Sequence, residues 1–517
     1  MTEFDSTAQV HEADVAVVGS GPAGLAAAIA AAEAGARVLL LEMNDDVGGR
    51  AIVSGGNIHL GGGHALQQAL GIEDSPEAVF QDWVRHDTPE SRFCDRRLVR
   101  VYAGESVATF DFLIRHGVRF PDAPVALNVD VKSVGPQSVP RVFRCEEWPD
   151  PAGVILRDSG RNGSGLTRAL EASARRLGVR IMTGHRMTGL SRGQAGRIDT
   201  LTGQGPRGPF RVSAHCGIVL ATGGSTGNVA FRRIFDPRLT EEYQQVGAPV
   251  AMQTADGEIA AMKLGAALWG TAAQTAGTYL VMSRTSHIGC RYGYPRLKFR
   301  PDSPAFAQAG ASGLTVSDWQ NVILVNQAGD RFWNEEDEEQ PFFDAAMAYC
   351  DRSGDPDGGG PIWAIFDADA VAREGWVTAP PHVDPAFFAC GETLEDLAAA
   401  IANPYQKQPM DGARLAATVA RYNGFVAAGR DADFGRPQPR HGICRGPFFA
   451  AWATPMIHDS LAGLRIDEEA RVLDIAGQPL PGLYCAGECQ GGFPQHGLGR
   501  SLLFGRIAGR SAAVQPA

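Results

Sequence analysis

The order of hydrophobic and polar positions near the start of the chain predicts a strand, a helix and a second strand. Residues 13–19 (ADVAVVG) form a short apolar run that is typical of a buried strand. Residues 22–35 (PAGLAAAIAAAEAG) have the small, mostly apolar side chains of a closely packed helix, and residues 36–42 (ARVLLLE) form a second apolar run. We therefore expect a βαβ unit with parallel strands.

Similar patterns return later in the chain. Residues 163–178 predict a helix that leads into a strand at 179–184, and residues 215–224 predict a strand that ends in a glycine turn. A strand with a glycine turn (482–492) and an amphipathic helix (501–513) close the chain. Between these parts the pattern is less regular and richer in Pro, Gly and aromatic residues. The expected fold class is α/β: a Rossmann-like domain formed by residues 1–271 and 447–517, with an inserted α+β substrate-capping domain at 272–446.

Composition narrows the class of protein. The 517 residues exceed what one core usually supports, and no apolar stretch reaches 18 residues, so we expect several domains and no transmembrane segment. A net charge of -11 disfavours nucleic acid as a partner. The nine cysteines are scattered, which suits a reducing cytoplasm. The first 14 residues lack the pattern of a signal peptide, and we expect a frayed leader there.

Two further patterns predict neither a metal site nor a binding site. Cys485 and Cys489 lie four residues apart, but no second Cys or His pair accompanies them, so we expect no metal. Residues 333–340 (WNEEDEEQ) contain five acidic residues and predict a solvated loop.

The most informative motif is G-x-G-x-x-G, formed by Gly19, Gly21 and Gly24 between the first strand and the first helix. The first glycine permits a tight turn, the second lets the backbone approach a pyrophosphate, and the third lets the helix pack closely on the strand. The helix N-terminus offers N–H groups to the phosphates. Glu42 follows the second strand, where a carboxylate can bind a ribose diol and would repel the 2′-phosphate of NADP. NAD and FAD remain open from this motif alone.

A second group of glycines favours FAD. Gly48, Gly49 and Arg50 follow the acidic residue, and residues 52–63 (IVSGGNIHLGGG) add further glycines. A long cofactor that lies extended across the domain needs such repeated close approaches of the backbone. We therefore expect FAD.

Several segments, taken in order, resemble one flavoprotein family. They are GSGPAGLAAAIAAAEAG, LLLE, VGGRAIVSGG, LATGGSTGN, TADGEIAAMKLGAAL, NQAGDRFWNEE, GLRIDEEARVLD and PLPGLYCAGECQGG. This series, which spans almost the whole chain, resembles the fumarate reductases, succinate dehydrogenases and ketosteroid dehydrogenases. Residues 55–77 are most similar to the flavin-dependent 3-ketosteroid dehydrogenases of the Δ4 type.

The resemblance implies a set of FAD-binding positions. Glu488 would bind the ribityl hydroxyls, and the start of the last helix, near Ser501 and Leu502, would stabilise the reduced flavin. Asp256 would belong to the cofactor turn or, as an equal alternative, cap a helix. The full set is Gly19, Gly21, Ala23, Gly24, Glu42, Met43, Gly48, Gly49, Arg50, Ser54, Gly55, Gly56, Arg186, Met187, Ala221, Thr222, Gly223, Asn228, Asp256, Gly487, Glu488, Ser501 and Leu502. We expect noncovalent FAD, with His59 and His64 as the nearby histidines that could challenge this.

Candidate catalytic residues come from the later part of the chain. His458, in HDSLAG, resembles the family's H-x-T-x-G-G histidine, with Ser460 at the Thr position and Ala462 replacing the first glycine; an ordinary scaffold histidine is the alternative. His496 and Arg500 lie before the last helix, in a segment several residues shorter than the family pattern. A basic aromatic stretch, 287–300, completes the candidates with Tyr292, Tyr294 and Arg296. A solvated surface strand is the equal alternative for this stretch.

Three functions are compatible with these residues. The first is an FAD-dependent dehydrogenase or reductase that transfers hydride at a carbon–carbon bond α,β to the carbonyl of a bulky apolar ketone. The second acts on a small carboxylate such as fumarate, tricarballylate or an aryl acrylate, with Arg291, Arg296 and His458 as a clamp; the absence of the family's arginine acid after residues 331–335 argues against it. The third relays electrons within a complex. The expected partners are a small-molecule substrate and an unidentified electron acceptor or donor.

Overall fold

The computed structural model describes residues 8–84, 94–121, 139–149, 162–193, 196–270, 282–283, 287–292, 306–337, 360–493 and 497–514. The chain divides into two compact units. Unit 1 comprises Met1–Phe235, Val250–Thr275 and Asp459–Ala517, and unit 2 comprises Asp236–Pro249 and Ala276–His458. These limits differ from the expected 272–446 insertion. The return to unit 1 comes later than expected because residues 448–457 pair with strands of unit 2.

Unit 1 is built on one mixed sheet, in the order β20-β21-β8-β1-β2-β5, with β7 joined to β8 and β6 to β7. Strands β21, β8, β1, β2 and β5 run parallel to one another, whereas β20 is antiparallel to β21 and β7 is antiparallel to β8. The predicted βαβ unit and parallel sheet are therefore present. The strands are β1 (Gln9–Val18), β2 (Val38–Leu41), β5 (Arg180–Met182), β6 (Arg186–Arg192), β7 (Ile198–Gly205), β8 (Gly208–Leu220), β20 (Arg471–Leu473) and β21 (Pro479–Cys485).

The start of β1 corrects one expectation. Residues Gln9 to Ala13 pair in parallel with residues Phe210 to Ala214 of β8, so this part of the polar opening is a strand and not a frayed leader. Residues 9–12 alternate between partly buried and exposed positions and are mostly polar, which explains why no apolar run predicted a strand there.

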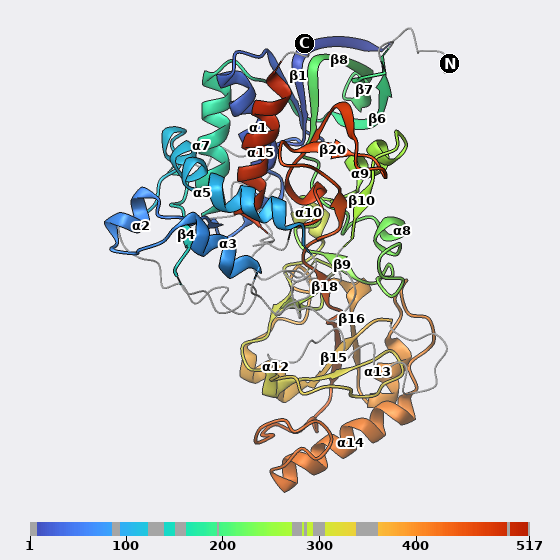
Figure 1. Cartoon of the computed structure of the whole chain (residues 1–517). Helices are drawn as coiled ribbons and strands as arrows, with labels where there is room; N and C mark the ends of the chain where they lie inside the picture. Colours follow the sequence, from blue (N-terminus) through green and yellow to red (C-terminus); the bar gives the residue numbers. More distant parts are fainter. Residues whose placement is uncertain are drawn as a thin grey trace. The chain divides into compact units, whose positions relative to one another are not determined.

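Three helices pack together on this sheet (Figure 1). They are α1 (Pro22–Glu33), α7 (Gly163–Arg176) and α15 (Leu498–Ala513), and α1 contacts both of the others. Residues Ala23 to Ala31 of α1 are all buried, since the helix is covered on every side. Small side chains are required here because backbone and neighbouring helices approach closely.

Smaller elements complete unit 1. Strands β3 and β4 form an antiparallel pair, as do β10 and β19. The elements are η1 (Gly49–Val53), β3 (Asn57–His59), α2 (Ala65–Ala69), α3 (Pro76–Val84), α5 (Arg96–Arg115), β4 (Val142–Arg144), α8 (Val229–Arg232), α9 (Asp256–Met262), β10 (Leu268–Trp269), β19 (Gly463–Leu464) and η6 (Gly487–Cys489).

Unit 2 contains an antiparallel sheet in the order β14-β15-β17-β16, with a core on each face. Two smaller sheets join β11, β18 and β9, and β12 with β13. Strands and helices together match the expected α+β class. The elements are β9 (Gln244–Gln245), β11 (Met282–Ser283), β12 (His287–Ile288), α10 (Phe306–Ala309), β13 (Leu314–Thr315), η4 (Trp319–Asn321), β14 (Ile323–Val325), β15 (Trp363–Asp367), α12 (Ala368–Glu374), η5 (Pro385–Phe387), β16 (Phe388–Gly391), α13 (Leu394–Ala400), α14 (Gly412–Ala428), β17 (Phe448–Trp452) and β18 (Met456–Ile457).

Within the described part of the chain, no helix combines the length and the apolar character needed to cross a membrane. The described residues also contain no group of three His, Cys, Asp or Glu side chains that could hold a metal ion.

Candidate functional site

Four of the segments expected to bind cofactor follow four adjacent strands. The strands β21, β8, β1 and β2 end at Cys485, Leu220, Val18 and Leu41, and they are neighbours in the sheet. Because they are parallel, their carboxyl ends lie at one edge, where open α/β sheets bind ligands in a crevice outside the strand ends. We call this edge of unit 1, from the end of β2 to the end of β21, the crevice. Tertiary structure thus brings together the segments beginning at 19, 42, 221 and 486.

The first of these segments is a glycine turn shaped by close contacts. Gly19 has φ +99°, and a Cβ there would lie 2.2 Å from the carbonyl oxygen of Ala221. A Cβ on Gly24 would lie 1.8 Å from the carbonyl oxygen of Gly19. At Gly21, the N-cap of α1, a Cβ would have no atom within 4 Å. Gly19 and Gly24 therefore serve the turn, while Gly21 leaves open space at the helix N-terminus for an anion.

Glu42 ties this turn to the end of β2. Its Oε2 accepts from the backbone N–H of Ser20 at 2.9 Å and from the Ser20 hydroxyl at 2.6 Å, and its Oε1 accepts from the N–H of Asn44 at 2.9 Å. The carboxylate is 5% exposed. Since each carboxylate oxygen accepts about two hydrogen bonds, Oε1 keeps capacity for a ribose hydroxyl.

The second glycine group lies against the first. The N–H of Gly48 donates to the carbonyl oxygen of Ser20 at 3.1 Å, and a Cβ on Gly49 would lie 3.4 Å from the Cα of Gly21. Gly48 and Gly49 both have positive φ, +112° and +51°. Two segments about 28 residues apart in sequence therefore present bare backbone to one place.

Glu488 is the centre of a buried polar cluster at the other end of the crevice. Its Oε2 accepts from Arg50 Nη2 at 2.8 Å and from Gln253 Nε2 at 2.6 Å, and its Oε1 accepts from the N–H of Ser460 at 2.8 Å. Arg50 also forms an ion pair with Asp459. Burial raises the pKa of the Glu488 carboxyl, while the charge of Arg50 opposes this shift. We call Arg50, Gln253, Asp459, Ser460 and Glu488 the Glu488 cluster.

Helix α15 extends past the start of α1 toward this cluster. Gly505 faces Ala23, and Gly509 faces Ala27, so the two helices are parallel. Because α15 begins at Leu498, it extends roughly six residues, about 9 Å, beyond the start of α1.

The N-terminus of α15 lies three residues earlier than the expected position near Ser501 and Leu502. The Ser501 hydroxyl donates to the carbonyl oxygen of Gly497, the N-cap, at 3.0 Å, and the Leu502 side chain is fully buried. The N–H groups left free by the helix are those of residues 497–500.

Comparison with known proteins identifies the family. A model of the FAD binding domain matches residues 14–500. The chain belongs to this family. It is an FAD-dependent oxidoreductase related to fumarate reductases and 3-ketosteroid dehydrogenases, and the expected resemblance is confirmed.

Three similar proteins illustrate how this chain compares with the family. A fumarate reductase (cytochrome) of Shewanella frigidimarina is 28% identical over 510 residues, which cover 97% of this chain and 77% of the relative. The open conformation of a flavocytochrome c3 fumarate reductase matches with a TM-score of 0.66 and 26% identity, covering 97% of this chain and 78% of that chain. The 3-ketosteroid-Δ4-(5α)-dehydrogenase from Rhodococcus jostii RHA1, in complex with 4-androstene-3,17-dione, matches with a TM-score of 0.57 and 26% identity, covering 99% and 98%.

The crevice fits FAD by its own geometry. Bare glycine backbone and a helix N-terminus suit a pyrophosphate, as in this family's fold. At the Glu488 end, Arg500 and Gln490 are buried, and polar atoms of both side chains have no hydrogen-bond partner among the described residues. Buried polar groups are nearly always satisfied, so a polar ligand is expected there.

Arg186, Asp256 and Asn228, three further residues expected to bind the cofactor, have structural partners. Arg186 Nε donates to Asp256 Oδ2 at 2.7 Å, and Arg186 Nη2 donates to Oδ1 at 2.9 Å. Ala255 is the N-cap of α9, so the alternative that Asp256 caps this helix is wrong. Asn228 caps α8 by accepting from the N–H of Phe231. Their contacts with a nucleotide remain predictions.

The structure describes only some of the catalytic candidates. His458 follows β18 and is partly buried, and Tyr292 lies under the guanidinium of Arg291 at 5.1 Å. Tyr294, Arg296 and His496 lie outside the described residues.

Sequence reasoning missed two members of the Glu488 cluster. Gln253 is 235 residues from Glu488, and no local pattern links them. Asp459 stood beside the two residues singled out in HDSLAG, but its pairing with Arg50 spans 409 residues.

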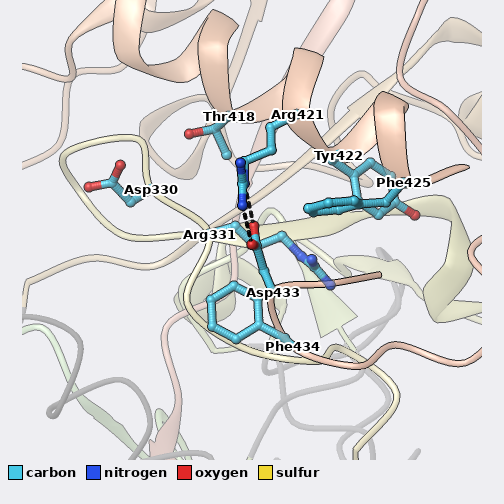
Figure 2. A pocket seen from close by; sticks show the side chains of 8 residues that line it. All are labelled: Asp330, Arg331, Thr418, Arg421, Tyr422, Phe425, Asp433 and Phe434. Atoms are coloured by element: carbon cyan, nitrogen blue, oxygen red, sulfur yellow. Dashed lines mark hydrogen bonds and ion pairs between the residues drawn. The ribbon is translucent and has the colours of Figure 1, made fainter. Parts of the chain in front are cut away.

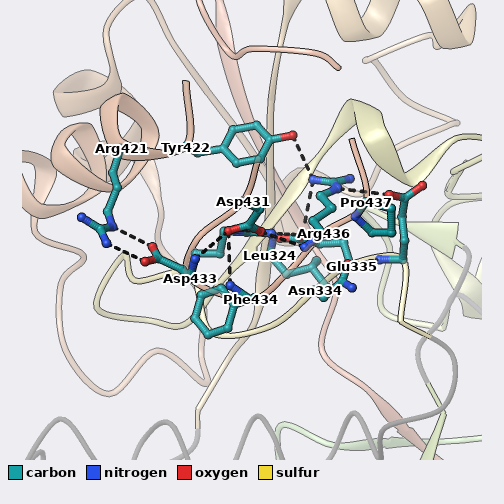
Figure 3. Close-up of polar contacts among 12 residues, drawn as sticks. Leu324, Asn334, Glu335, Arg421, Tyr422, Asp431, Asp433, Phe434, Arg436 and Pro437 are labelled. Atoms are coloured by element: carbon teal, nitrogen blue, oxygen red, sulfur yellow. Dashed lines mark hydrogen bonds and ion pairs between the residues drawn. The ribbon is translucent and has the colours of Figure 1, made fainter. Parts of the chain in front are cut away.

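Unit 2 holds its own buried charge network, shown in Figure 3, and it corrects the expectation of a solvated loop at 333–340. Glu335 is fully buried and receives Arg331 Nε at 2.8 Å and Nη2 at 2.7 Å. Arg436 lies 3.3 Å from Glu335, and Asp431 lies 2.8 Å from Arg331. The buried arginines attract this acidic segment inward; residues 338–340 lie outside the described part.

A cavity of about 240 Å³ lies beside this network (Figure 2). Its charged lining residues are already paired: Arg421 with Asp433, Asp330 with Arg414, and Arg331 with Glu335. Because these charges pair with one another, we regard the cavity as a structural feature of unit 2 and assign no substrate to it.

Proposed function

We propose that the chain dehydrogenates or reduces a carbon–carbon bond α,β to the carbonyl of a bulky apolar ketone, such as a ketosteroid. The supporting observation is the end-to-end match with the Rhodococcus jostii dehydrogenase, which covers 98% of that chain. The flavocytochrome matches at the same identity with a higher TM-score, 0.66 against 0.57, but over 78% of its chain. The stretch 55–77 points in the same direction.

In this proposal the crevice of unit 1 holds FAD, which supplies a two-electron acceptor or donor when bound. The glycine turns at 19–24 and 48–49 bind the pyrophosphate, Glu42 the ribose and Glu488 the ribityl hydroxyls. In the dehydrogenation direction, a hydride leaves the β carbon and a protein base accepts the proton from the α carbon. His458 and Tyr292 are the described side chains that we propose for proton transfer and carbonyl binding.

We further propose that FAD is held noncovalently. The two ring nitrogens of His64 contact the carbonyl oxygen of Leu60 and the N–H of Gln67, and its ring stacks on Phe110 at 3.8 Å. His59 packs its ring against Trp83 at 5.2 Å. These contacts occupy both histidines in the scaffold. A separate electron acceptor or donor and a cytoplasmic location complete the proposal, the latter supported by eight free cysteines in the described part.

One observation favours the alternative substrate, a small carboxylate. Arg291 contacts two neutral groups, the side-chain oxygen of Gln244 at 3.4 Å and the hydroxyl of Tyr405 at 3.0 Å. These contacts leave the positive charge of the guanidinium available to a carboxylate.

Anaerobic titration of the FAD-loaded protein separates the two substrates. We expect 3-ketosteroids to bleach the band of the oxidised flavin and tricarballylate to leave it unchanged. We expect fumarate and aryl acrylates, which can only accept electrons, to leave the reduced flavin unchanged. Arg291→Met should preserve the ketosteroid reaction. Bleaching by tricarballylate, or reoxidation of the reduced protein by fumarate or an aryl acrylate, would favour the alternative and contradict the ketone if the reaction is lost in Arg291→Met.

A further inference from the structure

Arg500 and Gln490 are among the buried side chains near the flavin end of the crevice that have polar atoms without a hydrogen-bond partner in the described part of the chain. Arg500 is 1% exposed, and its Nε and Nη1 have no hydrogen-bond partner among the described residues. Gln490 is 0% exposed, and both its Nε2 and its Oε1 lack a partner there. Leaving such groups unpaired costs free energy, so both are expected to meet a ligand.

The positions of both residues point to the ring end of FAD. Arg500 lies in the first turn of α15, and the carboxylates of Glu488 and Asp459 are near enough to influence its pKa. The backbone N–H of Gln490 donates to the carbonyl oxygen of Gly487 at 3.2 Å, in the segment that follows β21. Glu42, the ribose candidate, follows β2, while β21 lies beyond β8 on the opposite side of β1. A cofactor that has its adenosine at β2 therefore extends its ring toward β21.

The chemistry of the two side chains is complementary to one edge of that ring. The pyrimidine edge of a flavin carries two carbonyl oxygens and a ring nitrogen as acceptors, with one N–H donor between the carbonyls. A guanidinium offers only donors, and a glutamine amide offers donors and an acceptor. We propose that Gln490 and Arg500 bind the pyrimidine edge of the flavin and that the charge of Arg500 stabilises the reduced cofactor. This inference rests on the proposed binding of FAD.

Arg500 acts with the Glu488 cluster in setting the local charge. Arg50 forms ion pairs with both Asp459 and Glu488. Loss of Arg500 would remove one positive charge beside a ring that gains negative charge on reduction. In a buried site this charge is poorly screened, so the effect on the flavin should be large.

The test is the midpoint potential of the bound flavin, measured by anaerobic reduction in the presence of a reference dye. We expect Arg500→Met to lower the equilibrium constant for two-electron reduction about tenfold, a fall of about 30 mV. Arg500→Lys keeps the charge and should recover most of this loss. Gln490→Leu should weaken FAD binding about tenfold and change the potential less, because the amide is neutral.

Arg506→Met is the matched control. Arg506 lies on the same helix and forms an ion pair with Glu105, so its loss should reduce stability without changing the potential. An unchanged potential in yellow Arg500→Met, or an equal fall in Arg506→Met, would overturn the inference. If Arg500→Met does not retain FAD, Arg500→Lys decides: a potential within a few millivolts of the wild type supports the role of charge, and a full tenfold loss contradicts it.

The outcomes separate this inference from the proposed function. A wild-type protein that takes up no FAD contradicts both. A yellow wild type that does not react with ketones contradicts only the substrate, and an unaltered Arg500→Met potential contradicts only the role of Arg500.

Discussion

At the residue scale, the conformation of single glycines determines whether the crevice can form. Gly19→Ala should lower FAD affinity at least about tenfold and cost at least about 1 kcal/mol of stability, because positive φ is strained and the new Cβ would strike Ala221. FAD titration by fluorescence quenching and thermal unfolding measure the two effects.

Gly35→Ala provides the control for this substitution. Gly35 has φ +90°, but a Cβ there would meet no atom within 4 Å. It should show the backbone strain without the loss of FAD affinity. Equal FAD affinity in Gly19→Ala and the wild type would contradict the role of the turn.

Glu258 gives a pH-dependent prediction at the same scale. The side chain is fully buried beside Cys489, and burial raises the pKa of its carboxyl well above the usual value of 4.5. The folded state therefore holds this proton more tightly than the unfolded state, and stability falls as the pH rises above 4.5 toward the folded pKa. Glu258→Gln removes this titration. The difference in melting temperature, Glu258→Gln minus wild type, should therefore become more positive as the pH increases from about 5 to about 8.

Glu241→Gln removes an exposed carboxyl and is the control for this substitution. A difference between Glu258→Gln and the wild type that does not depend on pH would mean that Glu258 titrates like an exposed carboxyl.

At the element scale, the contact between α1 and α15 places the helix N-terminus beside the Glu488 cluster. A Cβ on Gly505 would lie 2.3 Å from the carbonyl oxygen of Ala23. We expect Gly505→Ala to destabilise the protein by about 1–3 kcal/mol through overpacking. Denaturant unfolding followed by circular dichroism measures this change.

Gly104→Ala, in α5 of the same unit, is the control and should have the opposite effect on stability. A Cβ there would meet no atom within 4 Å, so Gly104→Ala should stabilise by up to about 1 kcal/mol through helix propensity. If Gly505→Ala also stabilises the protein, the close approach of the two helices is not as described.

At the scale of the whole molecule, the two units depend on different interactions. Unit 1 is expected to be stabilised by FAD, and unit 2 by the network of Arg331, Glu335 and Asp431. Arg331→Met removes the positive charge that pairs with the buried carboxylates of Glu335 and Asp431. It should lower the free energy of unfolding by about 3–5 kcal/mol. Hydrogen exchange should show faster exchange in β14 and β15 for this variant, and slower exchange in β1, β2 and β8 when FAD is added.

Arg421→Met is the control, because Arg421 and Asp433 form an exposed pair that should contribute little. Faster exchange in unit 1 as well as unit 2 on Arg331→Met would show that the network does not act within unit 2 alone.

The sequence by itself determined the elements whose physical cause is local. The apolar run before Gly19, the small residues of α1 and the positions that require glycine predicted the βαβ unit, and the ordered motifs predicted FAD and the family. Polar strands such as the start of β1 escaped prediction, because their partner in β8 lies about 200 residues away and only pairing makes them strands.

Tertiary structure alone decided which distant side chains meet. It joined Arg50 and Gln253 to Glu488 and Asp459 to Arg50, and it turned the acidic segment around Glu335 inward onto two arginines. It also set the start of α15 at Leu498 and so placed Arg500, and not Ser501, in the first turn. Burial and charge compensation depend on the three-dimensional neighbours of a side chain, and local sequence does not contain them.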